Sequence, residues 1–322
     1  MPPLACRSMT ETAAVAPSAS AARIERRRRL VGIGLMCLAL FCFSGLDASA
    51  KWLNRSVDPM LTVWARYLSA VALVFVVINP WTKPGVLRTN RLWLQIIRSV
   101  LLFCSTAANF MALQYLQLVE ALSIVFATPL LVALLSGPIL GERAGPRRLA
   151  AIGVGFIGVL MITRPGLGAM HPAALLSLAG SVAYAFYNIV TRILATSDRS
   201  ETTLVYSGLA GVALTTPLVP FVWSTPDSLL TWALLIGLGA FGSVGHWLLI
   251  LAHARAPAPV LAPFIYTQIV WMLALGYFVF GDWPDPWTFI GASVVIASGL
   301  YLFYRERARP ARDRLESEAG HG

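Results

Sequence analysis

The sequence has few charged residues, histidines and cysteines, and each shortage argues against a class of function. Only 12% of the 322 residues are charged, about half the share that is usual in soluble domains. The four cysteines show no C-x-x-C spacing and the four histidines form no H-E-x-x-H motif. A disulfide framework, a metal site and a zinc enzyme are therefore not expected.

Clustered catalytic groups and nucleotide motifs are lacking too. The sequence contains no P-loop motif, so we expect no ATP hydrolysis and no cofactor. A membrane-embedded enzyme needs several catalytic side chains on adjacent helices, whereas the ionisable residues here are scattered singly. We therefore predict no catalytic residues.

Apolar residues, by contrast, are abundant and gather in long runs. Hydrophobic residues make up 57% of the chain, and the mean hydropathy is +0.70. Because a bilayer takes about 20 apolar residues to cross, we predict an all-α integral membrane protein with ten transmembrane helices. The predicted segments are 30–50, 60–78, 92–113, 118–140, 148–163, 173–194, 203–223, 229–251, 258–280 and 287–304. The tails, 1–29 and 305–322, are predicted to be disordered.

The placement of positive charge predicts the orientation in the membrane. Of the 25 Lys and Arg residues, 20 fall in the tails and loops of one side, and three (Lys51, Arg55 and Arg164) fall on the other. The positive-inside rule then places both termini in the cytoplasm, at a bacterial inner membrane. Since the basic residues form no continuous face, nucleic acid is not expected as a partner.

The N-terminus admits two interpretations. Arginines at 26–29, an apolar stretch and Ala48-Ser49-Ala50 together resemble a secretory signal with a cleavage site. Cleavage there leaves nine helices and puts the basic C-terminal tail outside. We therefore favour an uncleaved first helix.

The two halves of the chain match locally when the sequence is shifted by 140 residues. Gly141-Glu142 then falls on Gly281-Asp282, and Pro146 falls on Pro286. Five helices per half is an odd number, so the second half, 171–304, is predicted to be inverted relative to the first, 30–166. Inverted repeats are a recurring construction of secondary transporters, with the substrate site near the membrane midplane.

Short motifs near the end of each half resemble a known family. In the first half they are Pro129-Leu130, Gly141-Glu142-Arg143 and Arg164-Pro165-Gly166; in the second they are Ala262-Pro263-Phe264, Tyr266, Gln268, Trp271, Gly281-Asp282 and Ser298-Gly299-Leu300-Tyr301. Around them, 121–166 and 259–305 resemble the EamA domains of the drug/metabolite transporter superfamily. The resemblance implies ten helices, cytoplasmic termini and a central cavity lined by both halves. It is closest to a branch with riboflavin and S-adenosylmethionine uptake transporters, while other members export amino acids or opine-type metallophores.

Polar and aromatic side chains inside the predicted helices are the candidate site residues. Ser105 and Asn109 follow Arg98 at +7 and +11, which places the three close to one helical face. The residues predicted to bind substrate are Arg98, Ser105, Asn109, Tyr184, Asn188, His246, Tyr266, Thr267, Gln268 and Trp271. The candidates for proton coupling are Asp47, Glu120 and His246.

Structural alternatives stand beside each of these assignments. Asp47 and Arg66 lie at similar depth and are expected to form an ion pair or to leave Arg66 snorkelling. Arg98 is equally consistent with snorkelling, and His246 with a hydrogen bond to a neighbouring helix. Glu120 suits the positive N-terminal end of its helix. Two G-x-G-x-x-G strings, at 153–158 and 237–242, sit inside apolar helices and indicate close helix packing rather than nucleotide binding.

We therefore predict a secondary transporter that moves a small organic metabolite by alternating access, with a lean toward uptake of riboflavin or an S-adenosylmethionine-like compound. The alternatives are an exporter of amino acids or an opine-type metallophore, and a non-transporting structural or sensory membrane protein. The expected partners are the metabolite and the lipid bilayer, and the oligomeric state is left open between monomer and homodimer.

Overall fold

The computed structural model describes residues 19–77, 85–140, 146–164, 171–194, 197–256 and 258–319, and every regular element in these ranges is a helix. The longer helices are α1 (Ala19–Leu53), α2 (Pro59–Val77), α3 (Leu92–Ala112), α4 (Leu118–Val125), α5 (Thr128–Leu140), α6 (Pro146–Thr163), α7 (Ala173–Leu194), α8 (Ser200–Thr215), α10 (Leu229–Arg255), α12 (Gln268–Leu275) and α13 (Pro286–Ala319). The short elements are η1 (Thr216–Leu218), α9 (Val219–Val222), α11 (Ala258–Leu261), η2 (Ala262–Thr267) and η3 (Gly276–Phe280).

The helices have the length and composition of membrane spans. Within the described ranges, seven are long and apolar enough to cross a bilayer, and three further apolar helices are shorter. They coincide with the ten segments read from the sequence, so the prediction of a ten-helix multi-pass membrane protein is confirmed.

The fourth and the ninth spans, at equivalent positions of the two halves, are broken, and the seventh is interrupted by η1 between α8 and α9. The fourth predicted span, 118–140, consists of α4 and α5, with turn residues Phe126 and Ala127 between them. The ninth, 258–280, is divided into α11, the 3₁₀ helix η2, α12 and the π-helix η3. Pro263 lies in η2 and has no backbone N–H, so it cannot donate the hydrogen bond that an unbroken α-helix needs there.

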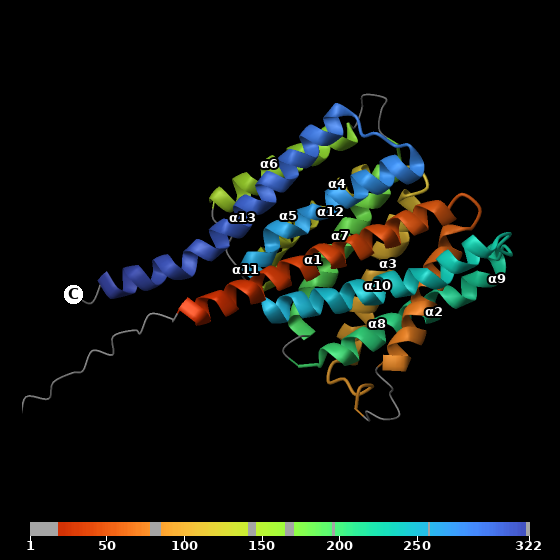
Figure 1. The fold of residues 1–322 in the computed structure, drawn as a ribbon, viewed down its shortest axis with the longest axis horizontal. Coiled ribbons are helices and arrows are strands. Elements are labelled where there is room, and N and C mark those ends of the chain that lie inside the picture. Colours follow the sequence, from red (N-terminus) through yellow and green to blue (C-terminus); the bar gives the residue numbers. More distant parts are fainter. Residues whose placement is uncertain are drawn as a thin grey trace, which may run out of the picture.

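In its largest contacts, each helix packs as its counterpart in the other half does, so exchanging the two halves leaves the packing pattern unchanged. α1 packs against α10 as α7 packs against α3, and α10 packs against α2 as α3 packs against α8. The broken span α4–α5 lies against α7 as the broken span η2–α12 lies against α1. The last helices of the halves, α6 and α13, run side by side along one edge (Figure 1). This exchange, with five spans per half, is the arrangement expected of two inverted repeats.

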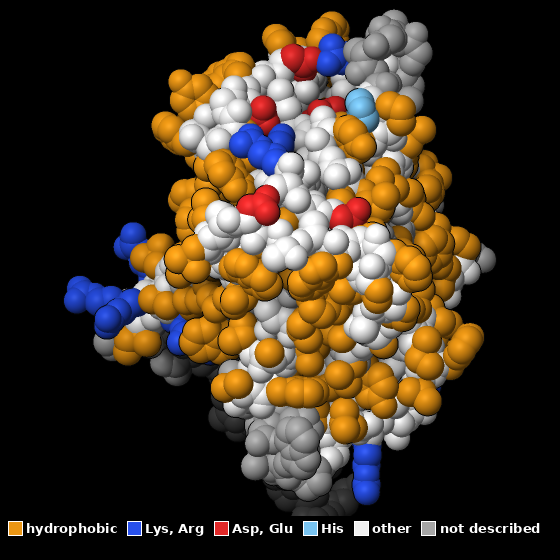
Figure 2. Space-filling view, turned by 90° about the vertical axis from the view of Figure 1, so that its right-hand side faces the viewer, with side chains coloured by type: hydrophobic (Ala, Val, Ile, Leu, Met, Phe, Trp, Pro, Cys, Tyr) orange, Lys and Arg blue, Asp and Glu red, His pale blue; other side chains and the backbone are white. Residues whose placement is uncertain are grey.

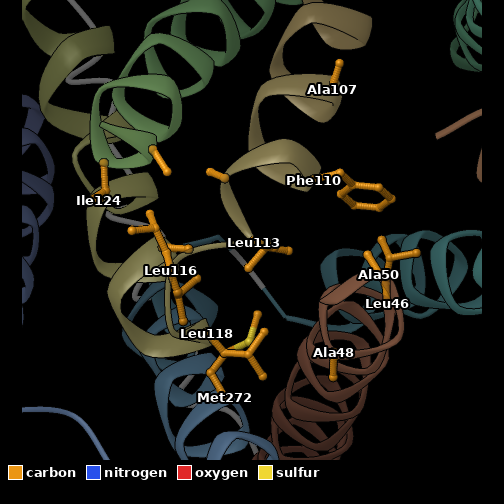
Figure 3. Close-up of a cluster of buried hydrophobic side chains, with 14 of the residues drawn as sticks. Leu46, Ala48, Ala50, Ala107, Phe110, Leu113, Leu116, Leu118, Ile124 and Met272 are labelled. Atoms are coloured by element: carbon orange, nitrogen blue, oxygen red, sulfur yellow. The ribbon is translucent and has the colours of Figure 1, made fainter. Parts of the chain in front are cut away.

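The largest hydrophobic core joins both halves. It includes Leu46 of α1, Phe110 of α3 and Leu118 of α4 from the first half, and Met272 of α12 from the second. Figure 3 shows Phe110 directed toward Leu46 and Ala50, with Met272 beside Leu118. The halves are therefore packed into one body by the same apolar surface.

Glycines allow several of these helices to approach closely. A Cβ on Gly155 of α6 would lie 2.2 Å from a methyl of Leu130, and one on Gly239 of α10 would lie 2.3 Å from the backbone nitrogen of Ala70. Gly155 and Gly239 belong to the two G-x-G-x-x-G strings, so the packing interpretation of those strings is confirmed at these positions.

The ends of the chain differ from the expectation. The prediction that 1–29 and 305–322 are disordered is wrong for the described parts, because α1 begins at Ala19 and α13 continues to Ala319. These extensions are rich in Ala, Arg and Glu, which are good helix formers, and they prolong helices that already have a nucleus. The remaining residues, 1–18 and 320–322, lie outside the described ranges. Figure 1 shows α1 beginning and α13 ending at the same end of the bundle.

Candidate functional site

Charged residues gather where α1 ends, and we call this the Lys51 end. Lys51 donates to the Asp282 carboxylate at 2.6 Å and to the Leu116 carbonyl at 3.0 Å. Arg164 forms an ion pair with Asp285. Figure 2 shows acidic and basic side chains close together on this end, surrounded by hydrophobic ones. Because Lys51 and Arg164 belong to the first half and both aspartates to the second, the pairs tie the halves together.

Glu120 belongs to the Lys51 end. It lies half-buried in the first turn of α4, close enough to Asp285, Arg164 and Lys51 for their charges to act on it. Beside it, burial raises the pKa of Asp285, but hydrogen bonds from Thr288 and the charge of Arg164 lower it more, leaving it below the ordinary value of 3.8. Glu120 is thus placed at a surface, away from the middle of the bundle.

At the opposite end of the bundle, which we call the Asp198 end, Asp198 joins the two halves. Asp198 lies between α7 and α8 and accepts hydrogen bonds from three donors of the first half: the Thr89 hydroxyl, the Asn90 N–H (3.1 Å) and the Gln95 amide (2.7 Å). Burial raises the pKa of Asp198, but these hydrogen bonds outweigh it and hold the pKa below 3.8. Asp198 therefore stays ionised at neutral pH and tightens the contact between the halves.

Arg98 is the most completely bonded charge inside the bundle. It lies two turns into α3 and is 5% exposed. Its own guanidinium, which has five N–H donors, makes four hydrogen bonds. The acceptors, together with Arg98, form what we call the Arg98 cluster: Tyr187 (2.6 Å), Thr191 (2.7 Å), the Thr203 carbonyl (3.1 Å) and Ser207. Tyr187 also places its ring 4.4 Å from the guanidinium. Arg98 does not snorkel to the surface; it joins α3 to α7 and α8.

A second polar group lies nearer the Lys51 end, and we call it the Arg66 cluster: Asp47, Arg66, Thr106 and Asn109. Arg66 of α2 donates to the Thr106 hydroxyl at 2.7 Å, and Asn109 of α3 donates to Asp47 of α1 at 3.3 Å. The sequence left open an ion pair between Asp47 and Arg66 or a snorkelling Arg66, and these two residues form no ion pair in the structure. Each bonds instead to a neutral side chain of α3, Arg66 to Thr106 and Asp47 to Asn109.

Side chains of α3 and α7 lie between the two clusters. Tyr184 and Asn188 are half-buried on α7, where Asn188 donates to the Tyr184 carbonyl at 2.6 Å. Tyr184 stacks on Tyr187 with ring centroids 5.3 Å apart, and it is near enough for the charges of both arginines to act on it. Ser105 is half-buried on α3, and its carbonyl faces Gly180 of α7. The structure thus brings Ser105, Asn109, Tyr184 and Asn188 to one interface between the halves.

His246 lies beside this interface on α10. Its ring meets the Phe43 ring of α1 edge-on with centroids 5.0 Å apart, and it is near enough to Arg66 and Arg98 to feel both charges. Its side chain is nevertheless exposed. The sequence left open a hydrogen bond between His246 and a neighbouring helix as an alternative. None of the described residues forms one.

The candidates of the ninth span form a separate group against α1 and α4. Tyr266 meets the Phe126 ring at 5.1 Å, so the breaks of the fourth and ninth spans touch each other. Thr267 donates to the Phe264 carbonyl at 2.7 Å, and Trp271 packs edge-on against Phe41 at 5.2 Å. The Trp271 indole N–H is buried without a hydrogen-bond partner. Gln268 begins α12 and is half-buried.

Several residues of these clusters were missed by the sequence analysis. Thr106 lies one turn from Asn109 on α3, and Tyr187 lies one turn from Tyr184 on α7. Neither was selected from the spacing of polar residues along its helix. Ser207 and Thr203 are separated from Arg98 by more than 100 residues, and no local signal points to them. Among the described residues, no three His, Cys, Asp or Glu side chains are placed to hold a metal ion.

Comparisons with known proteins agree with this architecture. The model of a family described as "EamA-like transporter family" matches residues 30–164 and 171–305. An S-adenosylmethionine uptake transporter of Rickettsia bellii is 28% identical over 279 residues, which is 86% of this chain and 94% of that protein. A riboflavin transporter of Vibrio cholerae is 27% identical over 290 residues, covering 88% of this chain and 97% of that protein. A crystal structure covers 89% of the chain with a TM-score of 0.58 and 19% identity, which shows a shared fold alone.

Proposed function

Since the chain belongs to the EamA-like transporter family, we propose that it imports riboflavin or an S-adenosylmethionine-like metabolite as a secondary carrier working by alternating access. The family makes it a membrane transporter. The class of substrate is supported by relatives of both kinds, which align over nearly their whole length, and the inward direction by the S-adenosylmethionine uptake transporters among them.

The observation that carries the proposal is a polar interface between the halves in the middle of an apolar bundle. Ionisable groups inside a membrane are costly and are usually functional. Here Arg66 from the first half lies near Tyr184 from the second, and Asp47 lies close to Arg66 and bonds to Asn109. All four residues are half-buried. A structural or sensory membrane protein is expected to close such an interface with apolar side chains instead.

Alternating access requires contacts that open at one end of the bundle while the other stays closed. The Lys51 end is joined across the halves by Lys51–Asp282 and Arg164–Asp285, and the Asp198 end by hydrogen bonds to Asp198. We propose that each set breaks when its own end opens. The excess of Lys and Arg assigns the Asp198 end to the cytoplasm.

Coupling to protons remains a prediction for three residues. Asp47 is half-buried beside Asn109, the exposed His246 ring lies against Phe43 of α1, and Glu120 lies at the Lys51 end. A carrier driven by protons should lose its dependence on external pH when the coupling residue is replaced by a neutral amide.

The test is uptake of radiolabelled riboflavin and of radiolabelled S-adenosylmethionine by bacteria that import neither, with and without this chain. We expect saturable uptake of one of them, competed by its unlabelled form. Uptake of neither, with the protein shown to be in the membrane, would contradict the proposal. Comparing metabolites in the medium of deletion and overexpressing strains then tests export of amino acids or metallophores.

A further inference from the structure

Asp47 and Arg66 are opposite charges that lie close together inside the bundle without pairing. Arg66 is near enough to act electrostatically on Asp47, yet the residue that bonds to Asp47 is Asn109, at 3.3 Å. In the described chain, the one hydrogen bond of the Arg66 side chain goes to Thr106. Thr106 and Asn109 are neutral, so neither charge is compensated by its bonding partner.

Both charged groups keep polar atoms that face accessible space. The guanidinium of Arg66 has five N–H donors and the carboxylate of Asp47 has two acceptor oxygens, more than their bonds use. A buried polar atom without a partner is costly, and seven side chains of the described residues carry one. Asp47 and Arg66 are not among the seven, and both are half-buried. Their unused donors and acceptors are therefore accessible rather than sealed in the core.

The Arg66 cluster is also held in place. The Thr106 hydroxyl receives a second hydrogen bond, from Tyr67 at 3.2 Å, and the Arg66 guanidinium lies over the Tyr67 and Phe110 rings at 5.4 and 5.6 Å. Tyr67, Thr106 and Phe110 are buried. The Arg66 cation is therefore fixed in position while part of it stays open, which is the state of a binding group rather than of a snorkelling side chain.

We propose that Asp47 and Arg66 bind the ammonium and carboxylate groups of an α-amino acid head on the transported metabolite. An α-amino acid zwitterion carries its ammonium and carboxylate groups on the same carbon, and these complement a carboxylate and a guanidinium that have not neutralised each other. The Tyr184 ring, between this cluster and Arg98, is placed to stack on the rest of a heteroaromatic ligand.

The inference rests on the proposed function and narrows it. Riboflavin has no amino acid head, whereas S-adenosylmethionine carries one, so the Arg66 cluster favours a substrate of the second kind. The cluster draws Asp47 from α1, Arg66 from α2 and Asn109 from α3, and it faces α7 of the other half. A ligand bound there contacts both halves, as a carrier that rocks around its substrate requires.

The experiment measures uptake of radiolabelled S-adenosylmethionine by Arg66→Gln and Asp47→Asn. Each variant removes one charge and keeps polar atoms, so we expect a loss in apparent affinity of about ten- to a hundredfold. Arg55→Gln and Asp227→Asn are the matched controls, because both residues are exposed in loops. The controls should take up the compound as the parent chain does, and all four variants should reach the membrane in equal amount.

A second measurement needs no variant. S-adenosylhomocysteine keeps the amino acid head and methylthioadenosine lacks it, so the first should compete for uptake by the parent chain at least about tenfold better than the second. Equal competition, or variants with unchanged affinity, would overturn the inference. Uptake of riboflavin that is insensitive to Arg66→Gln would overturn it while leaving the proposed function standing, and uptake of neither compound overturns both.

Discussion

The two arginines inside the bundle, Arg98 and Arg66, are chemically the same residue in opposite situations. Arg98 is 5% exposed and makes four hydrogen bonds to α7 and α8. Arg66 is half-buried and makes one, to Thr106. A charge within a membrane bundle therefore does not by itself indicate a substrate site. The donors that remain unused distinguish a group that binds a ligand from one that holds helices together.

The largest effect should come from removing the Arg98 cation. Arg98→Met keeps much of the volume but leaves Tyr187, Thr191 and Ser207 without their donor, so we expect a loss of about 3 kcal/mol in the free energy of unfolding. The measurement is the thermal midpoint of the purified protein in detergent, together with its abundance in the membrane. A midpoint equal to that of the parent chain would show that Arg98 does not hold α3 to α7 and α8.

At Arg66 we expect the opposite of Arg98, a small effect on stability and a large effect on transport. Arg66→Gln should change the thermal midpoint little, because a single hydrogen bond to Thr106 contributes about 1 kcal/mol. Its uptake of the labelled metabolite should fall by about tenfold or more, since the ligand loses a charged partner. The two variants measured side by side should separate stability from transport, and a variant that lost both equally would remove the distinction between the arginines.

A smaller effect, and one that depends on pH, is expected at Asp198. Its pKa is lower in the folded protein than the ordinary 3.8, so its hydrogen bonds stabilise the fold fully above that value and are lost as the pH falls through the lower, folded pKa. The difference in thermal midpoint between the parent chain and Asp198→Asn should be constant from neutral pH to about pH 5 and shrink only below about pH 4. A difference that disappeared near pH 6 would point to another titrating group.

The smallest effect is expected at the Lys51 end. The Lys51–Asp282 pair lies near the surface, where such pairs contribute up to about 1 kcal/mol. Asp282→Asn should therefore alter the rate of uptake by less than about fivefold, and the difference from the parent chain should decrease at high salt. Loss of the folded protein in this variant would mean that the pair has a larger structural role than its exposure suggests.

Much of the fold could be predicted because the bilayer sets the length of each apolar run. The ten segments follow from run length, and Pro263 in the sequence accounts for the interruption of the ninth. The helical extensions before residue 30 and after residue 304 could not be predicted from charge alone, because a helix already formed by apolar packing continues into polar residues at little cost.

The site was predicted less well, for a physical reason. Spacing along one helix places Arg98, Ser105 and Asn109 on one face, but it does not show what faces them. The hydroxyls that bind Arg98 come from residues 187, 191 and 207 of the other half, and the neutral partner of Arg66 comes from residue 106. Which arginine remains open is decided by these contacts across the chain, and so only the structure distinguishes them.

The most direct test of the difference between the arginines is a cryo-electron microscopy structure of the protein in lipid nanodiscs with S-adenosylmethionine bound. The ligand carboxylate should lie within hydrogen-bonding distance of the Arg66 guanidinium and its ammonium group beside Asp47, with the bonds of Arg98 to Tyr187 and Ser207 unchanged. A ligand bonded to Arg98, or lodged against Trp271 and away from Arg66, would contradict that assignment.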